Sequence, residues 1–282
     1  MEDTKSEDAG VSHRNTAKPD PAEAAQPRVA PPSAGAGPPS AGAVPPAEAV
    51  LTVLRPTGIT RGVALVLHGG RSHSFEPVQA RHLGPARMVP FARQLHRAGR
   101  KLGLEVWILR NRVRGWNGEE MSPLKDARWA LAKIREEHPG VPVYLLGHSM
   151  GGLTALCVAD DPQVDAVVAL APWLNDATPA APVAGRKVLI VHGDQDRWTS
   201  PTASLRFARR AAPDAEVLQY VSLKATGHFM IRRVRLWHTL ATGFLLKAFS
   251  ERSGVPAESP LRSVASLDRL VPPTAQTSPA VL

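Results

Sequence analysis

Short apolar runs alternate with longer amphipathic segments from residue 50 onward. Several of these runs are continuously apolar, as in Val63–Leu67 and Val167–Leu170. Strands with this pattern are covered on both faces, which is typical of a parallel sheet between two layers of helices. We predict strands at Val50–Leu54, Val63–Leu67, Leu104–Leu109, Val141–Leu146, Val164–Ala171, Lys187–Val191 and Glu216–Val221.

The amphipathic segments between these runs predict five helices. The second is the best delimited, because Ser122 is a suitable N-cap, Pro123 fits the first helical position and Pro139-Gly140 stops the pattern. Strands and helices that alternate with short links predict an α/β fold, a doubly wound and mostly parallel sheet flanked by helices. The predicted helices are Met88–Leu102, Pro123–His138, Gly151–Ala159, Thr202–Ala212 and Arg232–Phe249.

Composition divides the chain into three parts. Residues 1–48 are rich in Pro, Ala, Gly and Ser without apolar periodicity, and residues 251–282 contain repeated prolines. Such segments bury too little apolar surface to offset their ordering entropy, so we predict a disordered arm and a disordered tail. Residues 49–250 are then one folded domain.

The formal net charge of +9 is concentrated in the predicted domain. The arm has four Lys/Arg against seven Asp/Glu and the tail has three against three, which leaves the domain near +12. Its arginines are spread over predicted helices without a nucleic-acid-binding motif, so we predict no nucleic-acid partner. A basic surface can still favour anionic substrates.

Other bulk features narrow the setting. Cys157 is the single cysteine, so no intramolecular disulfide can form, and its place in a predicted helix favours a buried thiol. No apolar stretch has the length of a membrane span, and the acidic, proline-rich N-terminus lacks the features of a signal peptide. We therefore expect a soluble, cytoplasmic protein, whose oligomeric state the sequence leaves open.

The strongest chemical signal is Gly147-His148-Ser149-Met150-Gly151, which follows one predicted strand and precedes a predicted helix. A catalytic serine in this context lies on a sharp strand-to-helix turn, and the positions two before and two after it must be small. Gly147 and Gly151 meet that requirement. Ser149 is therefore the predicted nucleophile.

A serine hydroxyl needs a base to remove its proton and a carboxylate to orient that base. His228 lies in a loop after the last predicted strand, so it reaches the same sheet edge as Ser149. The loop after Val191 offers two carboxylates, and we favour Asp196 over Asp194 because it lies deeper in the loop. The predicted triad is Ser149, Asp196 and His228.

Oxyanion stabilisation requires two backbone N–H groups aimed at one point. The Met150 N–H follows the nucleophile at a helix N-terminus, whose dipole also favours negative charge. The second donor should come from the glycine turn after Val63–Leu67, where Gly70 is favoured and Arg71 is the alternative.

These motifs, taken together, resemble those of the α/β-hydrolase superfamily over about residues 50–249. The resemblance rests on the His68-Gly69-Gly70 turn, Gly147–Gly151, the Gly193–Asp196 loop and Gly227-His228, in the superfamily's order of Ser, Asp and His. The spacing is most similar to the esterase, monoglyceride-lipase-like and aminopeptidase-like branch. A cap domain often enters between the sixth and seventh strands of that branch, but only fifteen residues separate Ala171 from Lys187. The resemblance thus implies a serine hydrolase with an open, uncapped site.

Two arginine-containing segments lie at the predicted catalytic edge. Arg71–Arg87 follows the oxyanion turn and could form a pocket wall or a solvated loop. Arg110–Asn117 follows a strand; its arginines could bind a substrate anion, although pairing with Glu119, Glu120 or Asp126 is favoured. The remaining histidines lack metal-ligand spacing, so we predict no metal and no cofactor.

The sequence therefore predicts hydrolysis of a small-molecule carboxylic ester, or a related acyl bond, through an acyl-enzyme on Ser149. Acyl transfer and peptide cleavage use the same residues and stay open. A catalytically silent binding protein on the same fold is the alternative from another class.

Overall fold

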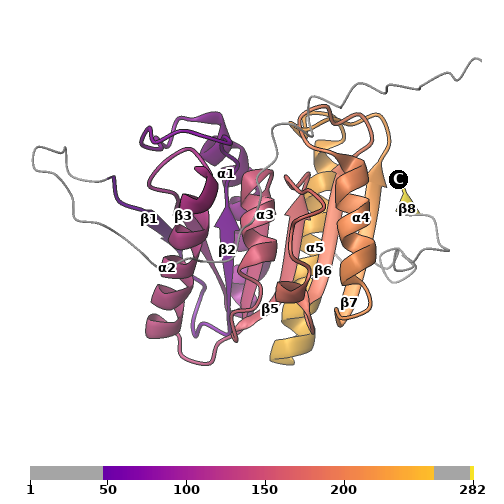
Figure 1. Cartoon of the computed structure of the whole chain (residues 1–282). Helices are drawn as coiled ribbons and strands as arrows, with labels where there is room; N and C mark the ends of the chain where they lie inside the picture. The colour runs from indigo at the N-terminus through magenta and orange to yellow at the C-terminus, as the bar shows by residue number, and fades with distance from the viewer. Residues whose placement is uncertain (1–46, 257–279) are drawn as a thin grey trace, which may run out of the picture.

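A computed structural model describes residues 47–256 and 280–282, which form one eight-stranded sheet with helices on both faces (Figure 1). The strand order is β1-β3-β2-β4-β5-β6-β7-β8, and β1 alone runs antiparallel to its neighbour. The strands are β1 (Val50–Leu54), β2 (Gly62–Leu67), β3 (Leu104–Arg110), β4 (Val143–His148), β5 (Val164–Leu170), β6 (Lys187–Gly193), β7 (Val217–Leu223) and β8 (Ala280–Val281). The predicted fold class is confirmed.

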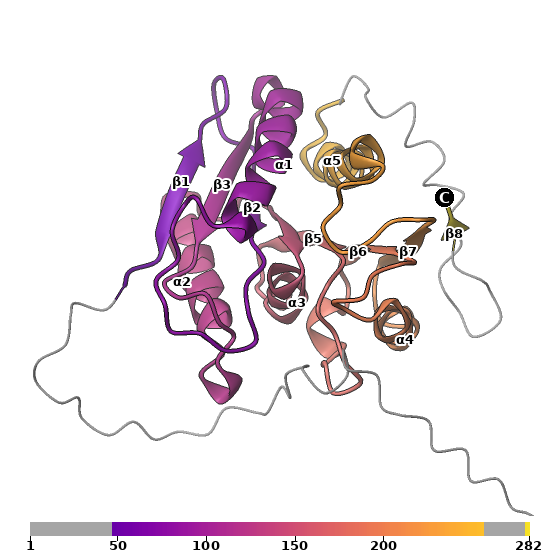
Figure 2. The same ribbon diagram turned by 90° about the horizontal axis from the view of Figure 1, so that it is seen from above.

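Helices cover the sheet in two layers, as the view from above shows (Figure 2). On one face lie α1 (Leu83–Gly99) and α5 (Val234–Ser253). On the other lie α2 (Ser122–Glu137), α3 (Met150–Cys157) and α4 (Pro201–Ala211). Every residue of the central strands β2 and β4 is buried, which explains why their sequences are continuously apolar.

All five helix starts differ from those predicted, by five residues for α1 and by one or two for the others. Helix α1 begins at Leu83, five residues before the predicted start. Its first turn accommodates Pro85 and exposes Leu83, so the apolar stripe that predicted the helix begins later than the helix itself. The predicted N-cap Ser122 is wrong. Met121, with a φ of 45°, caps α2, while the Ser122 hydroxyl accepts a hydrogen bond from Asn117 Nδ2 at 3.2 Å.

The two predicted disordered segments lie mostly outside the described residues, which exclude 1–46 and 257–279. The described part of the tail differs from that prediction. Helix α5 continues to Ser253, and Ala280–Val281 pair in parallel with β7, with Lys224 N–H donating to Leu282 O at 2.8 Å. A pairing across more than fifty residues satisfies the free edge of β7, and local sequence carries no signal for it.

The connection from β5 to β6 contains a single short 3₁₀ turn, Ala181–Val183. It therefore holds no helical cap, as the sequence predicted. Cys157 is buried in α3, and burial raises the pKa of its thiol to about 12.

Candidate active site

Ser149 lies between β4 and α3 with a φ of 56° and a ψ of −120°, a backbone conformation that side chains rarely adopt. The turn is tight enough to require glycine on both sides. A Cβ at Gly147 would lie 2.1 Å from Gly151 O, and a Cβ at Gly151 would lie 2.4 Å from Leu67 O. The packing of backbone on backbone thus produces the strained turn that the sequence predicted.

His228 and Asp196 come together at the carboxyl ends of β7 and β6. The His228 Nδ1 atom lies 2.8 Å from Asp196 Oδ2, and both residues are buried. Asp194 is placed elsewhere, where its Oδ1 atom accepts a hydrogen bond from Thr226 N at 3.4 Å. Of the two candidate carboxylates, only Asp196 contacts the His228 ring.

Asp196 is surrounded by donors. Its Oδ1 atom accepts hydrogen bonds from the backbone N–H groups of Trp198 at 2.8 Å and Thr199 at 2.9 Å. Its Oδ2 atom also lies 3.2 Å from His192 Nε2. Burial alone would raise the pKa of this carboxyl, but the hydrogen bonds from His192 and His228 together outweigh it and lower the pKa.

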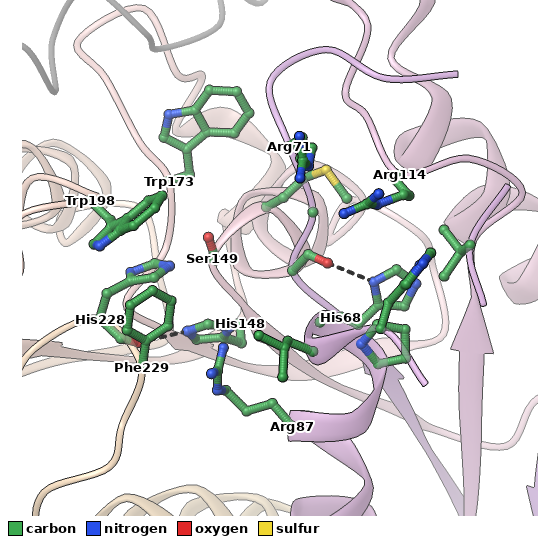
Figure 3. Close-up of a pocket in the computed structure, with 18 of the residues that line it drawn as sticks. His68, Arg71, Arg87, Arg114, His148, Ser149, Trp173, Trp198, His228 and Phe229 are labelled. Atoms are coloured by element: carbon green, nitrogen blue, oxygen red, sulfur yellow. Dashed lines mark hydrogen bonds between the residues drawn. The ribbon is translucent and has the colours of Figure 1, made fainter. Parts of the chain in front are cut away.

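This ionised acceptor sets the protonation pattern of His228. Because Asp196 can only accept, the His228 Nδ1 atom carries the hydrogen, which leaves the Nε2 lone pair free. Ser149 lies beside the His228 ring, and both residues line the same pocket (Figure 3). The arrangement can therefore remove a proton from Ser149 and return it to a leaving group.

Two backbone N–H groups are available beside Ser149. The Met150 N–H lies in the first turn of α3, where the helix supplies no acceptor. The Gly70 N–H has no backbone acceptor within the part of the chain that the structure describes, whereas the Arg71 N–H donates to Arg114 O at 2.8 Å. Gly70 rather than Arg71 is thus free to serve as the second donor.

His68 fixes the glycine turn. Its Nε2 atom accepts from Asn111 N at 3.1 Å, so its Nδ1–H donates to Gly69 O at 2.8 Å. Burial, as the largest influence, lowers the pKa of His68 to about 4, which keeps the ring neutral and both hydrogen bonds intact.

Solved structures of other proteins have a similar fold. The chain aligns with a lidless serine hydrolase from Xanthomonas campestris at a TM-score of 0.54 and 19% identity, over 75% of this chain and 91% of that one. A thermophilic esterase from Thermogutta terrifontis aligns at a TM-score of 0.56 and 17% identity, over 76% and 97%. These likenesses decide the fold. The chain has the α/β-hydrolase fold.

Sequence comparisons match shorter parts of this chain. A family model described as serine aminopeptidase, S33, matches residues 111–187, which include Ser149. A monoglyceride lipase homolog from Monkeypox virus is 34% identical over 82 residues, and human monoglyceride lipase is 30% identical over 114 residues. The viral match covers 26% of this chain and 30% of the viral protein, and the human match covers 37% of this chain and 32% of the human protein. The chain thus matches about a third of the length of these relatives.

Two further histidines, His148 and His192, contact the candidate site directly. His148 Nε2 lies 3.0 Å from His228 O, and the two rings are 4.8 Å apart. His192 contacts Asp196, and its Nδ1 atom lies 3.0 Å from Ser204 Oγ. Burial lowers the pKa of both rings. Their only signal in the sequence is position, next to Ser149 and four residues before Asp196.

A pocket of about 860 Å³ opens over Ser149. Trp173, Trp198 and Phe229 line it on the side of His228, whereas Arg71 and Arg114 line it on the opposite side (Figure 3). Both arginine-containing segments thus reach the site. As favoured from the sequence, Arg112 pairs with Asp126, at 2.5 Å.

No helix within the described residues is long and apolar enough to cross a membrane.

Proposed function

We propose that this α/β-hydrolase cleaves a carboxylic ester through an acyl-enzyme on Ser149. The observation that carries the proposal is the hydrogen-bonded pair of His228 and Asp196 together with a serine held at a positive φ, with Ser149 and His228 lining one pocket. The partial sequence match to a monoglyceride lipase and the structural similarity to an esterase favour an ester as the substrate.

The reaction follows from the positions of these groups. Ser149 Oγ attacks the ester carbonyl carbon while His228 Nε2 takes its proton, and the carbonyl oxygen becomes an oxyanion between the N–H groups of Gly70 and Met150. Asp196 stabilises the imidazolium without accepting its proton. The intermediate collapses as His228 protonates the departing alcohol, and water then releases the acid by the same two steps.

A fluorophosphonate probe and short p-nitrophenyl esters test the proposal together. We expect the probe to label Ser149 in the wild type and to fail in Ser149→Ala and His228→Ala. Ser149→Ala should also abolish ester hydrolysis while its thermal midpoint stays close to that of the wild type. Ser253→Ala, at the end of α5 remote from the pocket, is the matched control and should retain labelling and turnover.

Three results would contradict the proposal. Full turnover by Ser149→Ala would exclude Ser149 as the nucleophile. Labelling without turnover of any ester would retain the nucleophile but exclude ester hydrolysis. A folded wild type that is neither labelled nor active would favour a silent binding protein on this fold.

A further inference from the structure

The pocket over Ser149 is lined by four arginines and by no aspartate or glutamate. Folded surfaces normally intersperse charges of both signs, so that neighbouring charges offset one another. A pocket with one sign of charge concentrates ligands of the opposite sign. The four arginines are Arg71, Arg81, Arg87 and Arg114.

Three of these arginines lack an acidic partner in the described part of the chain. Arg114 pairs with Glu76, whose side chain lies outside the pocket and is 68% exposed. Some arginines outside the pocket are paired with carboxylates, as in Arg112–Asp126, Arg128–Asp160, Arg135–Asp161 and Arg206–Asp176. The charges of Arg71, Arg81 and Arg87 are not offset by a carboxylate of the described residues, and all three line the same pocket.

Arg87 is the most informative of the four because it is half-buried. Its guanidinium carbon lies 4.9 Å from the centre of the Phe229 ring, and its side chain reaches from α1 toward Phe229 and His148 (Figure 3). Burial lowers its pKa, which records the cost of placing an unneutralised cation there. An anion bound in the pocket would offset that cost.

The wall of the pocket on the side of His228 is largely apolar. Trp173, Trp198 and Phe229 lie on the side of His228, across Ser149 from Arg71 and Arg114 (Figure 3). A substrate that satisfies both walls needs an apolar part and a charged part, with the scissile carbonyl between them.

We propose that the substrates are esters that also carry an anionic group, a carboxylate or a phosphate, bound by the arginines that line the pocket. The guanidinium groups bind either anion through charge-assisted and bidentate hydrogen bonds. This inference rests on the proposed ester hydrolysis and adds the chemical class of the substrate.

Pairs of esters that differ in charge test the inference. Mono-4-nitrophenyl suberate is compared with 4-nitrophenyl octanoate, which places the anion on the acyl side. On the alcohol side, 4-(octanoyloxy)benzoate and 4-(octanoyloxy)phenyl phosphate are compared with neutral 4-(octanoyloxy)benzamide. We expect at least one anionic ester to exceed its neutral partner about tenfold in kcat/KM, as for one charge-assisted hydrogen bond, and the best pair identifies the anion and its side.

Variants assign the preference to the pocket. In Arg87→Gln and Arg71→Gln the ratio of anionic to neutral kcat/KM should fall about tenfold. Arg93→Gln is the matched control, because Arg93 lies exposed on the same helix as Arg87 but does not line the pocket. It should keep the wild-type ratio.

Two results would overturn the inference while ester hydrolysis stands: no anionic ester exceeds its neutral partner, or the ratio is unchanged in both pocket variants. If no ester is hydrolysed, the proposed function fails, and binding to Ser149→Ala decides the inference separately. Calorimetry should then show tighter binding of an anionic ester than of its neutral partner, and equal affinities would contradict the inference.

Discussion

At the scale of single residues, Asp196 is the most constrained group of the site. Backbone donors hold one of its oxygens, and His228, Thr199 and His192 surround the other. The carboxylate therefore orients the His228 ring while itself being fixed by the loop after β6. Its function depends on an acceptor at Oδ2, which an amide nitrogen cannot supply.

Asp196→Asn should lower kcat about 10³- to 10⁴-fold, because an amide nitrogen at Oδ2 would favour the tautomer that places the hydrogen on His228 Nε2. Asp194→Asn is the matched control, since the Asp194 side chain accepts a hydrogen bond from the Thr226 backbone N–H instead of contacting the His228 ring. It should lower kcat less than tenfold. Steady-state kinetics of both variants on one p-nitrophenyl ester provide the measurement, and a larger loss in Asp194→Asn would contradict the assignment of the acid.

The candidate triad could be predicted from sequence because each member lies in a short motif directly after a buried strand. His148 and His192 could not be placed in the same way. His148 contacts His228, which lies 80 residues later in the chain, and His192 contacts Asp196, which lies four residues later. Pairing of Arg112 with Asp126 was favoured from sequence, whereas the absence of acids around the pocket is visible only in three dimensions.

At the scale of elements, the turn after β2 and the start of α3 form the two halves of the candidate oxyanion site. They fit closely: a Cβ at Gly70 would lie 2.3 Å from Arg114 O and 2.3 Å from the Met150 methyl group. The backbone at Gly70 therefore approaches both α3 and the segment after β3. Any side chain there must displace the turn.

Gly70→Ala should lower kcat about 100-fold, since moving the turn withdraws one of the two N–H donors. At Gly69 a Cβ would lie 3.3 Å from His148 Nδ1 and Ser149 Cβ and 3.4 Å from His148 O, which is less crowded than at Gly70, so Gly69→Ala should lower kcat less than tenfold. Kinetics are compared with thermal midpoints for both variants. Equal losses of kcat at the two positions would show that the Gly70 N–H is not a donor to the oxyanion.

Element types could be predicted more reliably than element ends. The seven predicted strands correspond to β1–β7. The apolar runs of the inner strands are set by burial on both faces, whereas the edge strand β1 is only partly buried. The start of helix α1 was predicted too late because Leu83, its first residue, is 74% exposed and is not part of the apolar stripe. Strand β8 depends on an edge formed by β7 more than fifty residues earlier, and no local pattern encodes that pairing.

At the scale of the whole molecule, the sheet edge holds several imidazoles out of water. His68, His148 and His192 are buried, and burial is the largest influence lowering the pKa of each. In the unfolded chain these rings would take up protons near the ordinary value of 6.5. The unfolded state thus binds more protons than the folded state at mildly acidic pH, and the free energy of unfolding depends on pH.

The sign follows from His68, whose folded pKa is about 4. Its stabilising contribution is present above pH 6.5 and is lost as the pH falls toward 4. Between pH 7 and pH 5 this one ring should lower the free energy of unfolding by about 2 kcal/mol, and His148 and His192 add to the loss. Urea unfolding at both pH values measures it. His68→Gln should reduce the difference between the two pH values by about 2 kcal/mol, and a wild type equally stable at pH 5 and pH 7 would contradict neutral burial of these rings.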